Sequence, residues 1–216
     1  MKIALCFSGQ PRTFEKSFPY VEENLINCNP QHDFNLIGYL NSDSPFPSSK
    51  FDLLVVEEDV ELPDLNYQSQ NCHTYHARSV FYQLYGLQKV NELRKQHEQS
   101  KGFKYDYICR IRPDFQCITE VDLSNLEFDK IYLPVKDDWA GYNDRFAIGS
   151  NNVMDVYMSR YAFWMSEHPE IPNYIQHCLH YAEANLKLWL DKCNIEIDRI
   201  PFSYRCPTNR RLFLLL

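Results

Sequence analysis

Apolar and polar positions follow two different periods along the chain, and together they outline alternating strands and helices. Helical spacing is clearest where Val80, Leu84 and Leu87 recur on one face of a long segment. Short apolar runs predict strands at residues 1–7, 34–40, 51–56, 107–111, 130–133 and 195–200. Apolar residues three and four positions apart predict helices at residues 13–27, 77–99, 151–164 and 171–192.

This alternation predicts an α/β, Rossmann-like fold with a mainly parallel central sheet and helices on both of its faces. No repeat, low-complexity tract or linker interrupts the pattern, so we expect residues 1–216 to form a single domain. The chain closes on the apolar run LFLLL, with no polar residue after it. Such an ending suggests a sequence that continues beyond Leu216, or a last segment that packs on the body.

Two polar clusters directly follow predicted strands, at residues 8–12 and 112–114. Open α/β sheets bind their ligands outside the carboxyl ends of the strands. We therefore expect both clusters to lie at the ligand edge of the sheet.

Composition narrows the class of protein. The 216 residues carry a net charge of -7, with 24% charged and 15% aromatic residues, which is typical of a globular chain rather than a disordered one. The acidic balance argues against general nucleic-acid binding, which requires a basic surface, although a local basic pocket stays open. No apolar stretch approaches the roughly 20 residues that span a bilayer, and the amino terminus turns polar too early for a signal peptide. We expect a cytoplasmic protein.

Eight cysteines are scattered along the chain without a C-x-x-C pair, which argues against a zinc ribbon or a redox motif. In a cytosolic protein we expect reduced and mostly buried thiols. His73 and His76 lie three residues apart, but no cysteine or acidic residue stands at metal-ligand spacing from them. We interpret the two histidines as polar lining rather than as zinc ligands.

The first candidate cluster, SGQPR, comprises Ser8, Gly9, Gln10 and Arg12 around Pro11. A glycine at a strand-to-helix turn lets the backbone approach a ligand closely, and helix amides with an arginine favour a phosphate or diphosphate. The plain alternative is an ordinary turn with a surface arginine. Neither the P-loop pattern nor G-x-G-x-x-G is present, so the motif alone decides little.

The second cluster, in YDYICRIRPDF, is an apolar strand that leads into Arg110, Arg112 and Asp114. A carboxylate just beyond a strand end can hold Mg²⁺ or Mn²⁺, which prefer oxygen ligands and can bridge a diphosphate. The alternative is an ion pair that caps a turn.

The third cluster, in DDWAGYNDRFAIGS, offers Asp137, Asp138, Trp139, Asn143 and Asp144. Carboxylates, an amide and an aromatic ring are suited to sugar hydroxyls and ring faces, and one of the acids can serve as a base. A solvated loop, or Asp144 as a helix cap or partner of Arg145, is the structural alternative.

Four segments, IALCFSGQPRTF, HARSVFYQLYGLQKVNEL, YDYICRIRPDF and YNDRFAIGSNNVMDVY, stand in the order found in small glycosyltransferases with the GT-A fold, which the chain resembles over most of its length. Such enzymes usually carry an Asp-X-Asp motif that holds a divalent metal on the diphosphate of a nucleotide sugar. The matching triplet here is Arg112-Pro113-Asp114. The resemblance implies that Asp114 is the metal ligand, with Mn²⁺ or Mg²⁺ as cofactor, while Arg112 neutralises diphosphate charge itself.

The resemblance also places Ser8, Gly9, Gln10 and Arg12 beside the nucleotide. Arg78 is expected to reach the diphosphate from the first turn of the long helix, where a cation needs a compensating anion, and Gln83 to face the sugar. Asp144 is the expected catalytic acid or base, and Asp137 and Asp138 would face the sugar or the acceptor. Gln83 has an ordinary helix-surface position as its alternative.

The expected activity is transfer of a hexose-type sugar from a nucleoside diphosphate donor, with uridine diphosphate as the expected nucleotide, to a hydroxyl of a glycan or glycoprotein acceptor. Donor sugar, acceptor and stereochemical course stay open. Two alternatives are a nucleotidyltransferase, whose glycine- and lysine-rich opening loop is missing here, and a non-catalytic nucleotide- or sugar-binding module.

Overall fold

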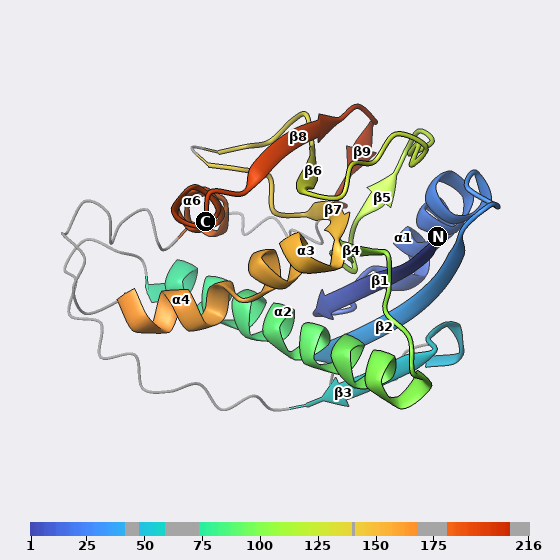
Figure 1. Ribbon diagram of the computed structural model, residues 1–216. Coiled ribbons are helices and arrows are strands. Elements are labelled where there is room, and N and C mark those ends of the chain that lie inside the picture. The colour runs from blue at the N-terminus through green and yellow to red at the C-terminus, as the bar shows by residue number, and fades with distance from the viewer. Residues whose placement is uncertain (42–47, 59–73, 140, 168–180, 208–216) are drawn as a thin grey trace, which may run out of the picture.

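The computed structural model of the chain describes residues 1–41, 48–58, 74–139, 141–167 and 181–207. Its centre is a sheet of seven strands in the order β3-β2-β1-β4-β7-β6-β8 (Figure 1). These strands are β1 (Lys2–Gly9), β2 (Asp33–Asn41), β3 (Leu53–Glu57), β4 (Tyr107–Ile111), β6 (Lys130–Pro134), β7 (Phe146–Ser150) and β8 (Glu196–Ile200). Two short strands, β5 (Gln116–Cys117) and β9 (Tyr204–Arg205), form a second, antiparallel pair.

Strand direction divides the sheet into two parts. Strands β3, β2, β1 and β4 run parallel to one another, and β6 and β8 are also a parallel pair. Strand β7 lies between β4 and β6 and is antiparallel to both. The predicted α/β class with a mostly parallel sheet is therefore confirmed, and the sheet is mixed rather than purely parallel.

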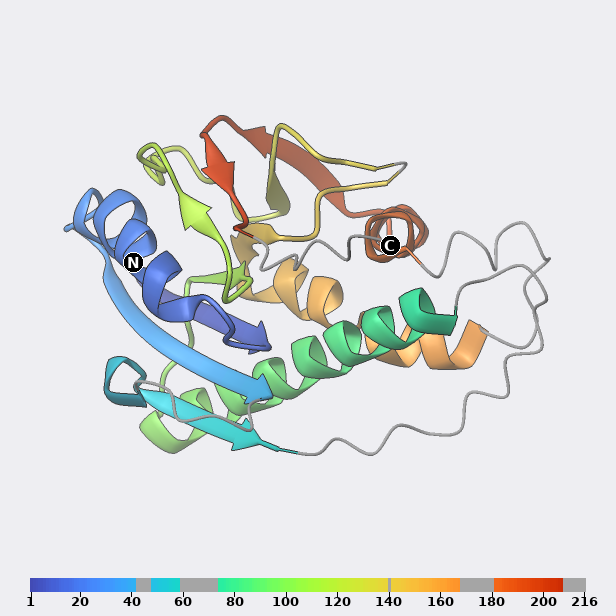
Figure 2. The same ribbon diagram turned by 180° about the vertical axis from the view of Figure 1, so that it is seen from behind.

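Helices cover the sheet on both faces. On one face, the long α2 packs on β1 and β2 and lies alongside α3 and α4, as the two opposite views show (Figures 1 and 2). On the other face, α1 packs its aromatic residues against β1 and continues into a π-helical turn at Glu22–Asn27. The α-helices are α1 (Phe14–Val21), α2 (Thr74–Lys101), α3 (Asn151–Met158), α4 (Arg160–Glu167) and α6 (Ala182–Lys192), with a 3-10 turn at Ser48–Lys50.

Side-chain alternation along the central strands builds two cores. In β1, Ala4 and Cys6 face α2, whereas Leu5 and Phe7 face α1, and all four are buried. A strand that is buried on both faces reads as a continuous apolar run, which explains why β1 is visible in the sequence.

Several element boundaries differ from the prediction. The helix predicted at 151–164 is two helices, because it breaks at Ser159, whose hydroxyl donates to the backbone oxygen of Val156 at 2.9 Å. Strand β7 is not among the strands that the apolar runs predict. Of the helix predicted at 171–192, residues 171–180 lie outside the described part of the chain, and α6 accounts for the remainder.

Six of the eight cysteines fall within the described ranges, and all six are free thiols. Cys6, Cys109 and Cys117 are buried, and burial raises the pKa of the Cys6 thiol to about 12. The other three, Cys28, Cys193 and Cys206, are half-buried, so the expected reduced state is consistent with these positions while full burial holds for only half of them. Cys72, Cys178, His73 and the terminal LFLLL lie outside the described residues.

Within the described ranges, none of the helices combines the length and the apolar character that a bilayer crossing requires.

Candidate functional site

The carboxyl end of β1 supplies an open backbone position. Gly9, the last residue of the strand, has φ of +112°, a conformation that favours glycine, and a Cβ built there would meet nothing within 4 Å. Ser8 beside it is buried against Gly86 of α2. A ligand group can therefore approach the backbone at Gly9 while Ser8 joins the strand to the helix.

Three further residues expected at the nucleotide occupy this edge. Gln10 and Arg12 follow β1 and are exposed. Arg78 lies on α2, but its side chain is outside the described part of the structure. The prediction that Arg78 stands in the first turn is wrong, because α2 begins at Thr74 and Arg78 falls one turn further in. The helix dipole therefore gives no argument for an anion at Arg78.

Arg110 is the most unusual residue at this edge. It lies in β4, opposite Cys6 of β1 and Ala147 of β7, on the sheet face that α2 and α3 cover (Figure 1). Its side chain is fully buried, and none of its guanidinium nitrogens, Nε, Nη1 or Nη2, has a hydrogen-bond partner among the described residues. Burial lowers the pKa of this guanidinium, against the opposing charge of Asp144. Polar groups buried in this way are rare because they lose their bonds to water without replacement.

Asp144 is the anion at the centre of the arginine cluster. It precedes β7, is only 2% exposed, and accepts a hydrogen bond from Nε2 of Gln83 on α2. Burial alone would raise the pKa of this carboxyl, but the charges of Arg110, Arg112 and Arg160 and the bond from Gln83 outweigh it and lower the pKa. Asp144 is therefore an ionised carboxylate. It stands just before β7 and interacts with side chains from α2, from β4 and the residues that follow it, and from α4.

Arg160 is held by backbone oxygens. Its Nε donates to the carbonyl of Tyr157 at 3.1 Å and its Nη1 to the carbonyl of Ala182 on α6 at 3.3 Å. The guanidinium carbon lies 4.7 Å from the centre of the Tyr157 ring. Its Nη2 is buried and has no hydrogen-bond partner within the described ranges. Arg160 thus presents one unused donor, as Arg110 presents a whole unpaired guanidinium.

Arg112 and Asp114 pair with each other at the exit of β4. Nε and Nη2 of Arg112 donate to the two carboxylate oxygens of Asp114, both at 2.9 Å. The Arg112 side chain is 32% exposed, so it links the buried cluster to solvent. Its backbone N–H donates to the carbonyl of Arg145 at 3.1 Å, which fixes the triplet against the segment before β7.

The donor set does not fit a preformed divalent metal site. Both oxygens of Asp114, the predicted ligand, already accept bonds from a guanidinium, and Asp144 is surrounded by arginines. No group of three or more His, Cys, Asp and Glu side chains within the described residues could hold a metal ion. A cation of charge +2 would enter a region where arginine charge already dominates.

The loop expected to grip the sugar is held by its own ion pairs. Asp138 accepts two bonds from Arg199 of β8, at 2.9 and 2.8 Å, and Asp137 pairs with Arg145 at 2.8 Å. Asn143 is fully buried and donates from Nδ2 to the carbonyl of Lys136 at 2.6 Å. These three side chains are therefore already engaged in shaping the loop.

Trp139 differs from its neighbours because 66% of it is exposed. Its φ of +40° and that of +64° at Asp137 are uncommon for residues with side chains. The structure thus separates Trp139 from the buried Asp144, although both belong to one sequence cluster.

Four residues of the site escaped the sequence-based assignment of roles: Arg110, Tyr157, Arg160 and Glu183. Glu183 stands in the first turn of α6, and Asp144, Arg145 and Arg112 all influence its charge. One signal was available, since an arginine inside the apolar strand YICRI must be buried on whichever face it points to. Arg160 and Glu183 carry no such signal, because they reach the cluster only through the folding of α4 and α6.

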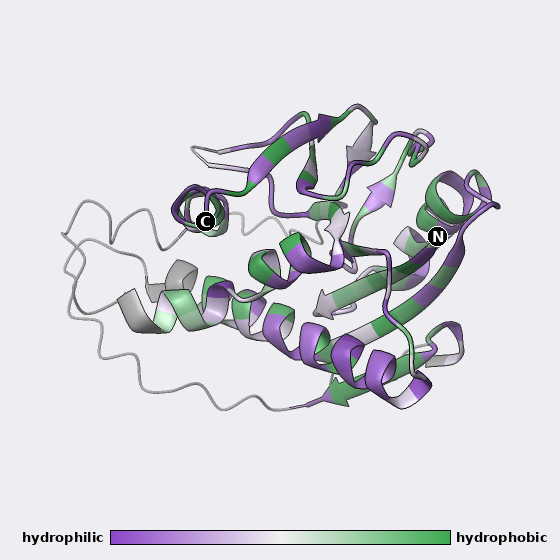
Figure 3. Cartoon of the chain, in the orientation of Figure 1, coloured by the Kyte–Doolittle hydropathy of each residue, from purple (hydrophilic) through white to green (hydrophobic). Residues whose placement is uncertain are grey.

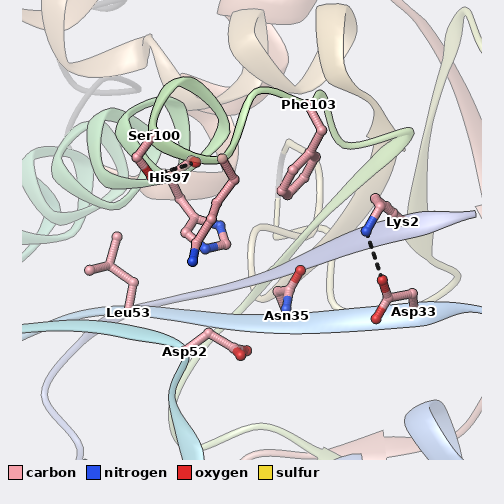
Figure 4. A pocket seen from close by; sticks show the side chains of 9 residues that line it. Lys2, Asp33, Asn35, Asp52, Leu53, His97, Ser100 and Phe103 are labelled. Atoms are coloured by element: carbon pink, nitrogen blue, oxygen red, sulfur yellow. Dashed lines mark hydrogen bonds and ion pairs between the residues drawn. The ribbon is translucent and has the colours of Figure 1, made fainter.

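A shallow pocket of about 490 Å³ opens at the opposite end of the sheet, where β1 and β2 begin and α2 ends (Figure 4). Its polar groups are mutually engaged: Lys2 pairs with Asp33 at 3.0 Å, and the Tyr105 hydroxyl lies 2.7 Å from His97 Nδ1 and donates to Asn35 at 3.1 Å. Its lysines and carboxylates are mixed in sign, so we place the candidate site at the carboxyl edge instead.

Comparison with known proteins identifies a family without identifying an activity. A search of curated proteins finds no match. A family model described as a domain of unknown function (DUF7796) matches residues 1–213, which is nearly the whole sequence. The chain therefore belongs to the DUF7796 family.

Proposed function

We propose that the chain is a glycosyltransferase that moves a hexose-type sugar from a nucleoside diphosphate, expected to be uridine diphosphate, to a hydroxyl of a glycan or glycoprotein. The observation that carries this proposal is the buried, unpaired guanidinium of Arg110 at the carboxyl edge of the sheet. A buried guanidinium that makes no hydrogen bond costs stability. A diphosphate group would supply the acceptor oxygens that Arg110 lacks, and negative charge in addition to that of Asp144.

The balance of charge supports the same ligand. Arg110, Arg112 and Arg160 surround Asp144, and the carboxylate of Asp114 is committed to Arg112. This leaves positive charge in excess within a region of low dielectric. When the bond between sugar and diphosphate breaks, negative charge develops on the leaving oxygen, and guanidinium groups that are already in place stabilise it without reorganising.

The position of the cluster agrees with ligand binding in open sheets. It lies where the parallel neighbours β1 and β4 end; α1, which follows β1, and α2, which precedes β4, lie on opposite faces of the sheet. The resemblance to GT-A glycosyltransferases in four segments favours a nucleotide sugar over other diphosphates. In this proposal Ser8, Gly9, Gln10 and Arg12 lie on the nucleotide side.

Incubation with a panel of nucleotide sugars, including uridine diphosphate glucose, galactose and N-acetylglucosamine and guanosine diphosphate mannose, tests the proposal. We expect slow release of the free nucleoside diphosphate from at least one donor as water replaces the acceptor. A second arm supplies a nucleoside triphosphate with a sugar 1-phosphate, and release of pyrophosphate there would indicate a nucleotidyltransferase. Binding without turnover would indicate a binding module, which the pairing of Asp114 with Arg112 makes the second candidate.

An arm with a chelator tests the expected Mn²⁺ or Mg²⁺. Because arginines can neutralise the diphosphate, we expect donor hydrolysis in a chelator to stay within about tenfold of the rate with Mn²⁺, a difference of about 1.4 kcal/mol. Complete loss of turnover, restored by Mn²⁺, would show instead that Asp114 leaves Arg112 to bind a metal ion.

A further inference from the structure

Two carboxylates adjoin the proposed site, and they differ in how accessible they are. Asp144 is 2% exposed and accepts a bond from Gln83. Glu183 is half-buried and forms no ion pair with any described residue. A general base must come within hydrogen-bond reach of the proton that it removes. Glu183 meets this requirement more readily, because part of its side chain is open to solvent.

Their surroundings also favour opposite protonation states. Three arginines lower the pKa of Asp144 despite its burial. Burial raises the pKa of Glu183, and the neighbouring charge of Asp144 raises it further, while Arg145 and Arg112 act in the other direction. A carboxylate with a lowered pKa is a weak base, whereas a raised pKa brings Glu183 closer to the working pH.

The backbone fixes Glu183 relative to Asp144. The N–H of Tyr142 donates to the carbonyl of Glu183 at 3.0 Å. At Gly141 a Cβ would lie 2.0 Å from that same carbonyl oxygen, so only glycine allows the loop to lie against α6 this closely. Arg160, which bonds to Ala182, holds the other side of the first turn of α6. The loop before Asp144 and the first turn of α6 therefore form one connected unit.

We propose that Glu183 is the general base of the transfer reaction, and this inference rests on the proposed glycosyltransferase function. The acceptor oxygen forms a bond to the anomeric carbon as the bond from that carbon to the diphosphate oxygen breaks. The electron pair leaves with the diphosphate, and the hydroxyl proton passes to a carboxylate oxygen of Glu183. This direct displacement inverts the anomeric configuration.

Asp144 then has a different task. Its charge holds Arg110, Arg112 and Arg160 together, and Gln83 fixes its orientation from α2. It acts through the arginines and is a positioning residue, so its loss should weaken diphosphate binding as well as turnover. Loss of Glu183 should affect turnover alone.

The test compares Glu183→Gln with wild type by hydrolysis of the active uridine diphosphate sugar between pH 5 and 9. Water is the acceptor, and uridine diphosphate affinity is measured in parallel. We expect at least a hundredfold lower turnover, the usual scale of lost base catalysis, with affinity within twofold. The wild-type acid limb should lie above the ordinary glutamate pKa and disappear in the variant. Glu196→Gln, an exposed glutamate that pairs with Lys130, is the matched control and should leave turnover unchanged.

The outcomes separate this inference from the function on which it rests. Turnover of Glu183→Gln within threefold of wild type would overturn the role of Glu183 while leaving the transferase intact. A wild-type chain that binds uridine diphosphate but hydrolyses no donor at any pH would overturn both the role of Glu183 and the transferase activity, and would indicate a binding module. If no nucleoside diphosphate binds the wild type, the proposed function itself is wrong.

Discussion

Arg94 and Arg110 are both fully buried on the same face of the sheet, but their hydrogen bonding is opposite. Arg94 lies near the end of α2 and donates from Nε to Asn91 at 3.0 Å, from Nη1 to Glu98 at 2.9 Å, and from Nη2 to Asp155 of α3. Arg110 donates to no group in the part of the chain that the structure describes. The hydrogen bonds of Arg94 are therefore complete without a ligand, whereas those of Arg110 are not.

This difference separates a structural network from a binding site. The later turns of α2 are mostly hydrophilic (Figure 3), yet Arg94 and Glu98 are buried there because each finds partners. A satisfied buried network adds rigidity, whereas an unsatisfied one costs stability. The burial of Arg110 is explained if an anionic ligand accepts its hydrogen bonds. The following variants test the difference between Arg94 and Arg110.

The largest effect is expected from Arg94→Met. Removing one member of a buried ion pair usually costs about 3–5 kcal/mol, because Glu98 and Asp155 would keep their charges without their main partner. Urea unfolding measures the loss in free energy of unfolding. A loss below about 1 kcal/mol would mean that the Arg94 network does not stabilise the fold. It would contradict the structural role that we assign to Arg94.

Asp144→Asn should cost about 1.5–3 kcal/mol at pH 7, the range for bonds to charged groups. The pKa of Asp144 is lowered in the folded chain, so its stabilising contribution is present above the ordinary aspartate pKa and is lost as pH falls through the folded value. The difference between wild type and variant should therefore shrink between pH 5 and pH 3. Unfolding curves at several pH values decide this, and a pH-independent difference would rule out an ionised Asp144.

Arg110→Met is expected to raise the free energy of unfolding by about 1 kcal/mol, the opposite sign to Arg94→Met. The net lowering of the Arg110 pKa means that the cost of burying this guanidinium without hydrogen bonds exceeds its attraction to Asp144, so an apolar side chain of similar volume should be better tolerated. The same urea unfolding experiment applies. A loss above about 1 kcal/mol would indicate that Arg110 has partners within the folded chain, and the contrast with Arg94 would then disappear.

The smallest effect is expected from Asp138→Asn, below about 1 kcal/mol, because its pair with Arg199 is partly exposed. Nucleotide affinity should not change, since Asp138 already uses both carboxylate oxygens within the loop. Calorimetric titration with uridine diphosphate checks this. A tenfold weaker affinity would show that Asp138 contributes to ligand binding, as the sequence analysis predicts.

The sequence predicted strands with a clear apolar composition and missed a strand of equal length with a mixed composition. Strand β1 is buried on both faces and stands out as an uninterrupted apolar run, and β4 was predicted to the residue. Strand β7 has five residues that include Gly149 and Ser150, so its composition gives little strand signal. Its position between β4 and β6 follows from tertiary pairing rather than from local preference.

For the candidate site, the sequence predicts which edge of the sheet carries the site, but not which side chains form its hydrogen bonds and ion pairs. Residues that follow β1 and β4 must share one edge because these strands are parallel neighbours. Whether a carboxylate there is free depends on distant residues: Asp138 meets Arg199, which lies 61 positions away, and Asp144 meets Gln83 at the same separation. No local pattern separates the engaged Asp138 from the accessible Glu183.

The most direct test of the account is a calorimetric titration of uridine diphosphate into wild type and Arg110→Met at one fixed salt concentration. We predict saturable binding to wild type and at least tenfold weaker binding to the variant, since one charged hydrogen-bond donor set is worth about 1.5–3 kcal/mol. The variant should be at least as stable as wild type, so unfolding would not explain the loss. Equal affinities, or no binding of any nucleoside diphosphate to wild type, would contradict the claim that Arg110 awaits an anionic ligand.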